Sequence, residues 1–277
     1  MKKILVTTDF SANAKAGIQF ALNLSALGGF ELVFYYGLEM LKPVSWTEHR
    51  YNEYIAQEKE REQDILAKYL AKTFKKKGLP LDNLTCVVGI GENMEDTLIS
   101  YAQDIKADYI CMSTRGAGVI KKVFGSTAST LVTTSPIPLI VVPHTYRTRP
   151  ITTVWYASDL ENLFPELDIA AQFAKNLNAK IVVVNYNHWI DKAKNKKIVE
   201  DAALKYAPLN IPFKFKEMSL EHSLAHHLND DLKRARPALL ILFTKQNRGW
   251  FDRIFASSNS ADLAFDAKVP LVIFRKK

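Results

Sequence analysis

Glycines, hydroxyl side chains and cations gather in residues 112–127, directly after a short apolar run at residues 109–112. The apolar run is typical of a buried strand, and the residues that follow the segment are typical of a helix. Backbone N–H groups at the start of a helix lack intrahelical partners and favour anions, and glycines let the chain approach an anion closely. The segment therefore favours phosphate binding, with Gly125, Ser126 and Thr127 at the helix start. An ordinary glycine-rich turn is the alternative.

Two common phosphate-binding fingerprints do not fit this segment. No Gly-x-x-x-x-Gly-Lys-Ser/Thr sequence occurs in the chain, so the segment is not a P-loop. Gly116 and Gly118 are followed by Lys121, where the dinucleotide fingerprint has a third small residue. The phosphate prediction therefore depends on the other motifs of the first half.

Those motifs fall at the ends of expected strands. The first strand, residues 4–6, leads into Thr-Asp-Phe-Ser at residues 8–11, and the late loop is bounded by Gly116 and Gly125-Ser126. Two prolines precede an apolar strand at residues 139–142. In this order the motifs resemble the universal stress protein family, over about residues 1–145.

The resemblance implies the fold. We expect an α/β chain of two tandem Rossmann-like domains, of the HUP or adenine nucleotide alpha hydrolase-like kind. Each domain would hold a five-stranded parallel sheet of order 3-2-1-4-5 with helices on both faces. Apolar strands such as residues 4–6 fit such a sheet, because its central strands are buried on both faces.

The resemblance also implies an adenine nucleotide site in the first half, for ATP or a related nucleotide with Mg²⁺. Asp9 would contact the base, although Asp9 or Ser11 could instead cap the next helix. Gly89 and Gly91 would clear space for a ribose, and Gly37 stands where the family often has valine. The predicted ligand-contacting residues are Thr7, Asp9, Gly37, Gly89, Met112, Ser113, Gly116, Gly125, Ser126 and Thr127.

Two departures from the family pattern favour a second hypothesis, a nucleotide-free interaction or scaffold protein. Ser113 replaces the first glycine of the late loop, and eight residues rather than nine separate Gly116 from Gly125. An enzyme is the weakest hypothesis, at most a slow ATPase, because we can name neither a catalytic base nor a metal clamp.

The second half repeats the first. Residues 153–160 resemble the first strand and its turn, which places Asp159 where Asp9 stands, and a proline-led strand ends both halves. Gln246 and Ala256 replace the loop glycines, so we expect no nucleotide in the second half. We predict domains at residues 1–145 and 151–277. The tandem chain would pair them internally through their last strands, while a homodimer stays open.

Positive charge is concentrated in the second half. Residues 1–146 carry 16 Lys and Arg against 15 Asp and Glu, and residues 147–277 carry 21 against 14. An acidic partner would fit this excess, but without any RNA-binding signature or zinc finger we expect a solvated basic surface and no nucleic-acid partner. His222 and His226 have metal-ligand spacing on a helix but lack an intervening Glu, so no metal site is predicted.

The chain has no apolar run long enough for a membrane span, and its first residues already form a strand pattern. Only two cysteines are present, which fits a reducing compartment. We therefore expect a cytoplasmic protein without a membrane partner. In the family's strand order, Cys86 and Cys111 lie on strands separated by two others, which predicts two buried thiols and no disulfide.

Overall fold

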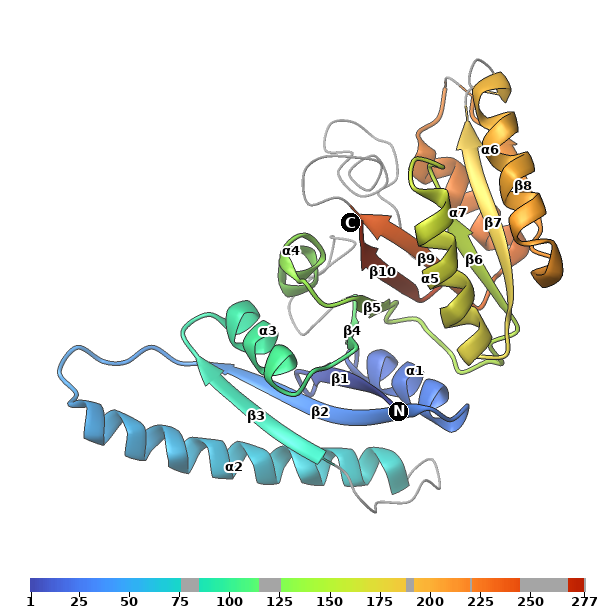
Figure 1. Cartoon of the computed structure of the whole chain (residues 1–277). Helices are drawn as coiled ribbons and strands as arrows, with labels where there is room; N and C mark the ends of the chain where they lie inside the picture. The colour runs from blue at the N-terminus through green and yellow to red at the C-terminus, as the bar shows by residue number, and fades with distance from the viewer. Residues whose placement is uncertain (76–84, 115–125, 188–191, 220, 245–268, 277) are drawn as a thin grey trace. The chain divides into compact units, whose positions relative to one another are not determined.

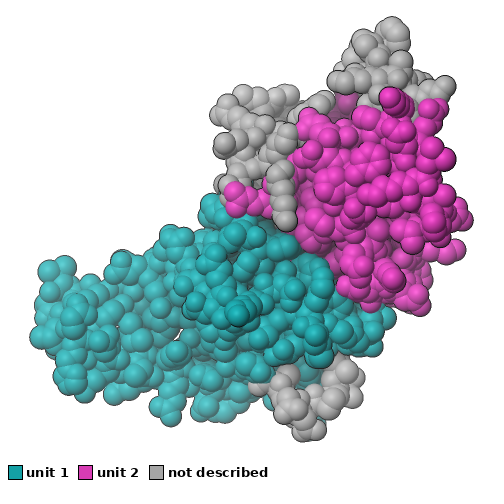
Figure 2. Space-filling view, viewed as in Figure 1, with its two compact units in different colours: residues 1–119, 124–139 teal, residues 120–123, 140–277 magenta. Residues whose placement is uncertain are grey.

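The structure is a computed structural model that describes residues 1–75, 85–114, 126–187, 192–219, 221–244 and 269–276. Its chain divides into two compact units. Unit 1 comprises residues 1–119 and 124–139, and unit 2 comprises residues 120–123 and 140–277 (Figure 2). No helix among the described residues is both long enough and apolar enough to cross a membrane.

Unit 1 alternates strands and helices along the chain (Figure 1). The elements are β1 (Lys2–Thr8), α1 (Lys15–Ala26), β2 (Phe30–Glu39), α2 (Glu48–Lys75), β3 (Thr85–Gly91), α3 (Met94–Asp104), β4 (Tyr109–Ser113) and α4 (Ser126–Thr134). The strands form a parallel sheet in the order β3-β2-β1-β4. β1 is central in this sheet, which explains why Ile4, Leu5 and Val6 are fully buried.

Helices cover both faces of this sheet, because alternate residues of β2 contact different helices. Phe34 packs against Phe74 of α2, with ring centroids 5.7 Å apart. The next residue, Tyr35, stacks on Tyr101 of α3 at 5.6 Å. Successive side chains of a strand point to opposite faces, so α2 and α3 lie on opposite sides of β2 (Figure 1).

Unit 2 repeats the pattern. Its elements are β5 (Leu139–Val142), β6 (Thr153–Ala157), α5 (Leu163–Asn176), β7 (Lys180–Asn187), α6 (Lys192–Lys205), the short 3-10 helix η2 (Ala207–Leu209), β8 (Phe213–Glu217), α7 (Leu224–Ala235), β9 (Leu239–Thr244) and β10 (Leu271–Arg275). The strand order is β5-β10-β9-β6-β7-β8. Thus β5 lies beside β10, the strand pair expected from the sequence.

The strand registers show how closely the two halves correspond. Ile4 pairs with Leu32 and Tyr109, and Val154 pairs in the same way with Ile181 and Leu239. The last strand of each half begins in the same way. The backbone N–H of the residue after Tyr109 donates to the carbonyl of the proline just before β5, and the backbone N–H of the residue after Leu239 donates to the carbonyl of the proline just before β10. The prediction of two tandem α/β repeats with parallel strands is confirmed.

The two cysteines are unpaired, as predicted. Cys111 on β4 is fully buried, whereas Cys86 on β3 is only half-buried. The expectation of two buried thiols is therefore wrong for Cys86. The sheet order explains the difference, because β3 is the outer strand of unit 1 and β4 lies next to central β1.

Candidate functional site

The predicted site residues that the structure describes lie along one edge of the unit 1 sheet. Thr7 is near the end of β1, and Asp9 follows that strand directly. Gly37 of β2 is the register partner of Gly89 of β3. Because the strands are parallel, their carboxyl ends meet at this edge. This carboxyl edge is where open α/β sheets bind ligands.

Only the two ends of the late loop lie within the described residues. Met112 and Ser113 end β4, and Ser126 and Thr127 begin α4, with Thr127 half-buried. Gly116 and Gly125 lie outside the described residues. The phosphate contacts predicted for this loop therefore stay predictions.

Asp9 belongs to a tight polar turn at the end of β1. Its Oδ1 accepts a hydrogen bond from Ser11 N at 3.0 Å, and Thr8 Oγ1 accepts one from Phe10 N at 3.1 Å. Phe10 has a φ of 60°, in the left-handed region. Ser11 Oγ accepts from Ala14 N at 3.1 Å, so Ser11 caps the turn before α1 while Asp9 holds the strand end. The Asp9 side chain is exposed at the carboxyl edge.

Aromatic packing fixes this turn. The Phe10 ring lies 4.5 Å from the Tyr36 ring and 5.3 Å from the Tyr69 ring, measured between centroids. Tyr36 comes from β2 and Tyr69 from α2, so two elements hold the residue next to Asp9. The turn therefore has a defined position on the fold.

The glycines of the edge make room for side chains of the chain itself. A β-carbon added at Gly37 would lie 1.8 Å from Met94 Cε, and one added at Gly89 would lie 1.8 Å from the Tyr35 hydroxyl oxygen. At Gly91 the nearest atom would be Thr97 Oγ1, at 2.2 Å. The clearance expected for a ribose is therefore filled at these positions. Packing explains the glycines, and their contact with a ligand stays a prediction.

Two residues at this edge escaped the sequence analysis. Gly17 lets α1 approach β4 closely, since an added β-carbon would lie 3.1 Å from Met112 C and 3.2 Å from Ser113 N. A glycine inside a helix lowers the stability of the helix by about 1 kcal/mol relative to alanine. A glycine in the helical sequence of α1 was therefore the signal that could have indicated this close approach. Among the described residues the buried Tyr35 hydroxyl has no hydrogen-bond partner, and burial, with Tyr101 nearby, raises the pKa of Tyr35 to about 12.

The second half contains the same turn as the first. Ser158 Oγ accepts from Leu160 N at 3.0 Å, and Asp159 Oδ1 accepts from Glu161 N at 3.1 Å. Leu160 has a φ of 66°, close to the value at Phe10. The sequence alignment of Asp159 with Asp9 is thus reproduced in three dimensions.

The surroundings of the second turn are more ionic. Lys276 Nζ donates to Asp159 Oδ2 at 2.5 Å and lies 3.6 Å from Glu166 Oε1. The Tyr156 hydroxyl donates to Glu166 Oε2. Burial raises the pKa of Glu166, and burial beside this carboxylate also raises the pKa of Tyr156.

The histidines of unit 2 form no metal centre that the described residues reveal. His222 and His226 stack with centroids 4.1 Å apart, and His226 Nε2 lies 3.4 Å from Asp230 Oδ2. His227 Nε2 accepts from Ser219 N at 3.2 Å. Among the described residues, no group of three or more His, Cys, Asp or Glu side chains could hold a metal ion.

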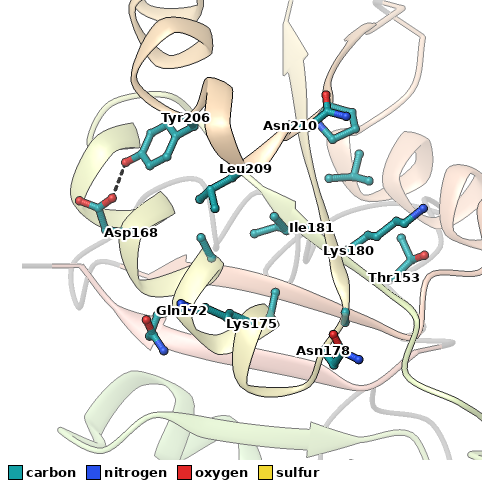
Figure 3. Close-up of a pocket in the computed structure, with 15 residues that line it drawn as sticks. Thr153, Asp168, Gln172, Lys175, Asn178, Lys180, Ile181, Tyr206, Leu209 and Asn210 are labelled. Carbon is teal, nitrogen blue, oxygen red and sulfur yellow. Dashed lines mark hydrogen bonds between the residues drawn. The ribbon is translucent and has the colours of Figure 1, made fainter.

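A pocket of about 1010 Å³ opens in unit 2, between α5, the start of β7 and η2 (Figure 3). It lies at the amino ends of the strands, since Thr153 and Lys180 are the first residues of β6 and β7. At one side the Tyr206 hydroxyl points to Asp168 and donates to it at 2.6 Å (Figure 3). None of the predicted site residues that the structure describes lines this pocket, which lies at the opposite edge from the Asp159 turn.

Two repeats of parallel strands with matching registers and matching aspartate turns define a tandem α/β protein of the Rossmann-like class. The model of the universal stress protein family matches residues 1–143, more than half of the chain, and the chain belongs to this family. None of the curated proteins matches it.

Solved structures extend the likeness over the whole chain. A universal stress protein from Archaeoglobus fulgidus DSM 4304 is 14% identical with a TM-score of 0.67, and the match covers 99% of this chain and 98% of that one. A functionally unknown protein from Pseudomonas aeruginosa PAO1 is 13% identical with a TM-score of 0.61, covering 99% and 92%. At these identities the likeness shows the fold.

Proposed function

We propose that the protein is a universal stress protein whose first half binds an adenine nucleotide, ATP or a relative, at the carboxyl edge of β1, β2 and β4. The observation that carries this proposal is the Asp9 turn. It stands at the end of β1, where the chain continues to β2 on one side while β4 lies on the other. A point where neighbouring strands continue in opposite directions across the sheet is the usual ligand position of an open α/β sheet.

The chemistry of the edge supports a nucleotide. The exposed Asp9 carboxylate can accept hydrogen bonds from the exocyclic amino group of adenine. α4 begins at Ser126, and a helix start favours phosphate through its unpaired N–H groups and its dipole. Mg²⁺ would accompany the phosphates as in other nucleotide sites.

One observation favours the nucleotide-free scaffold as a second candidate. The spaces over Gly37 and Gly89 are occupied by Met94 and Tyr35, so the edge is already packed where the sequence suggested an opening. A nucleotide would then have to bind nearer to Asp9 and the β4 end. The scaffold would act through protein partners, with a homodimer as one form.

The test is titration calorimetry of the nucleotide-stripped chain with ATP and AMP, in the presence of Mg²⁺. Asp9→Ala removes the proposed base contact. A hydrogen bond to a charged group contributes about 1.5–3 kcal/mol, so we expect the Kd to rise by roughly 10- to 150-fold. Asp64→Ala, at an exposed position of α2, is the control and should bind as the parent does.

The outcomes separate the candidates. The nucleotide role is supported if the parent binds a nucleotide, Asp9→Ala binds it more weakly and Asp64→Ala binds it as the parent does. No heat with either nucleotide excludes it and supports the scaffold. Phosphate release measured in the same samples decides whether the bound ATP is hydrolysed. The unpaired thiols fit action in a reducing compartment, for which we propose the cytoplasm.

A further inference from the structure

The carboxyl edge of the second half already contains a cation. We propose that Lys276, after β10, is a built-in ligand of this edge: its ammonium occupies a carboxylate site formed by Asp159, Glu161 and Glu166 and closes it to ligands from solution. The proposal concerns the second half alone and does not depend on nucleotide binding in the first.

The geometry places the ammonium among all three carboxylates. Lys276 Nζ lies 2.5 Å from Asp159 Oδ2, 3.6 Å from Glu166 Oε1 and 3.8 Å from Glu161 Oε2. The Lys276 side chain is 5% exposed and that of Glu166 6% exposed, so this contact differs from a solvated surface ion pair. A buried charge persists only with such partners.

The backbone of the same residue is also anchored. Lys276 N donates to Thr244 O at 2.8 Å, which continues the pairing of β10 with β9 beyond the last strand residue, Arg275. The side chain is therefore directed from a fixed point on the sheet. The Tyr156 hydroxyl also contacts this site. It donates to Glu166 Oε2, so that Glu166 Oε1 is the oxygen that lies near the ammonium.

The first half has an apolar residue at the position of the Tyr156 hydroxyl. By strand register Val6 occupies the position of Tyr156, since Val6 pairs with Phe34 and Cys111 as Tyr156 pairs with Val183 and Ile241. The two halves thus share the aspartate turn and differ in the strand side chain near it, which is Val6 in the first half and Tyr156 in the second. Ligands of open α/β sheets usually bind at this edge, and in the second half a side chain of the chain itself occupies it.

The proposal predicts that a small amine can replace the side chain. Lys276→Ala removes three methylene groups and the ammonium, which together match the n-propylammonium ion. The variant leaves the buried carboxylate of Glu166 and the mostly buried carboxylate of Asp159 without their cation, so its melting temperature should fall by roughly 5–10 °C. Adding n-propylammonium chloride to the variant should restore much of this loss in a saturable manner.

Controls separate this effect from general salt effects. Tetramethylammonium chloride has no N–H donor and should not restore the variant. The parent chain should show no saturable gain with n-propylammonium, because its site is filled. Lys233→Ala removes an exposed ion pair with Asp230 and should change the melting temperature little, with no rescue by the amine. Equal stabilisation of the parent and Lys276→Ala by n-propylammonium would overturn the proposal.

A second measurement needs no destabilised variant. Brief acylation of the native full chain, followed by mass spectrometry, reports the accessibility of each lysine amine. We expect Lys276 to be protected relative to Lys233, and we expect Asp159→Asn to remove that protection. Labelling of Lys276 in the native parent as fast as that of Lys233 would show that the site is open and would refute the built-in ligand.

Discussion

Gly89→Ala separates two explanations for the glycines of the carboxyl edge, internal packing and clearance for a ligand. The added methyl would lie 1.8 Å from the Tyr35 hydroxyl oxygen, 2.4 Å from Cζ and 2.8 Å from Cε2. Tyr35 is 2% exposed, and its ring is stacked on Tyr101. The ring is therefore buried against α3, and we expect the strand or α3 to move to admit the methyl group.

The expected loss follows from two opposing effects. Overpacking a core costs about 1–3 kcal/mol. Replacing glycine by alanine in a strand recovers about 0.5–1 kcal/mol of backbone entropy. The contact with the buried Tyr35 ring favours the upper part of the overpacking range, about 2–3 kcal/mol. We therefore expect Gly89→Ala to lower the free energy of unfolding by about 1–2.5 kcal/mol, which corresponds to a melting temperature lower by roughly 2–10 °C.

Gly37→Ala is the matched control on the partner strand. Its nearest atom would also lie at 1.8 Å, but that atom is Met94 Cε, the end of a flexible side chain. Methionine adapts readily to its surroundings, so we expect a loss below about 0.5 kcal/mol. The two variants thus have the same nominal overlap and differ in the stiffness of the neighbour.

Thermal and urea unfolding followed by circular dichroism measure both variants, and calorimetry with ATP measures binding. The packing explanation requires Gly89→Ala to be clearly less stable than Gly37→Ala. If the two variants are equally stable, the reasoning from neighbour stiffness is wrong. If Gly89→Ala keeps the parent's stability yet weakens nucleotide binding, the space belongs to a ligand.

Three further outcomes follow from buried groups. Tyr35→Phe removes a buried hydroxyl that has no hydrogen-bond partner in the described part of the chain. The free energy of unfolding should therefore stay unchanged or rise by up to about 1 kcal/mol, seen as an unchanged or higher melting temperature. Burial raises the pKa of Glu166, so ionisation of this group destabilises the fold as pH rises above its ordinary pKa of about 4.5. The stability of the parent relative to Glu166→Gln should therefore fall as the pH rises above about 4.5 in parallel urea titrations, and an increase in stability would contradict this prediction. Burial raises the pKa of the Cys111 thiol, so a thiol reagent should label half-buried Cys86 first and reach Cys111 only on unfolding, as mass spectrometry would show.

The sequence by itself determined the alternation of strands and helices, the repeat and the family. Central parallel strands are buried on both faces, so they must be continuous apolar runs, and residues 4–6 and 239–242 show this directly. The aspartate turns were also visible, because a turn of this kind is formed by neighbours in the chain. Asp9 and Asp159 each bond to the backbone two residues ahead.

Only the tertiary structure decided what surrounds those turns. Met94 and Tyr35 fill the space over the edge glycines, and no periodicity indicates which side chain from another element will do so. The same holds for Lys276, which is 117 residues from Asp159 in the chain. A local pattern indicates which face of an element is buried. The partner on that face is set by how distant elements pack, and this decides whether an aspartate faces solvent or a lysine.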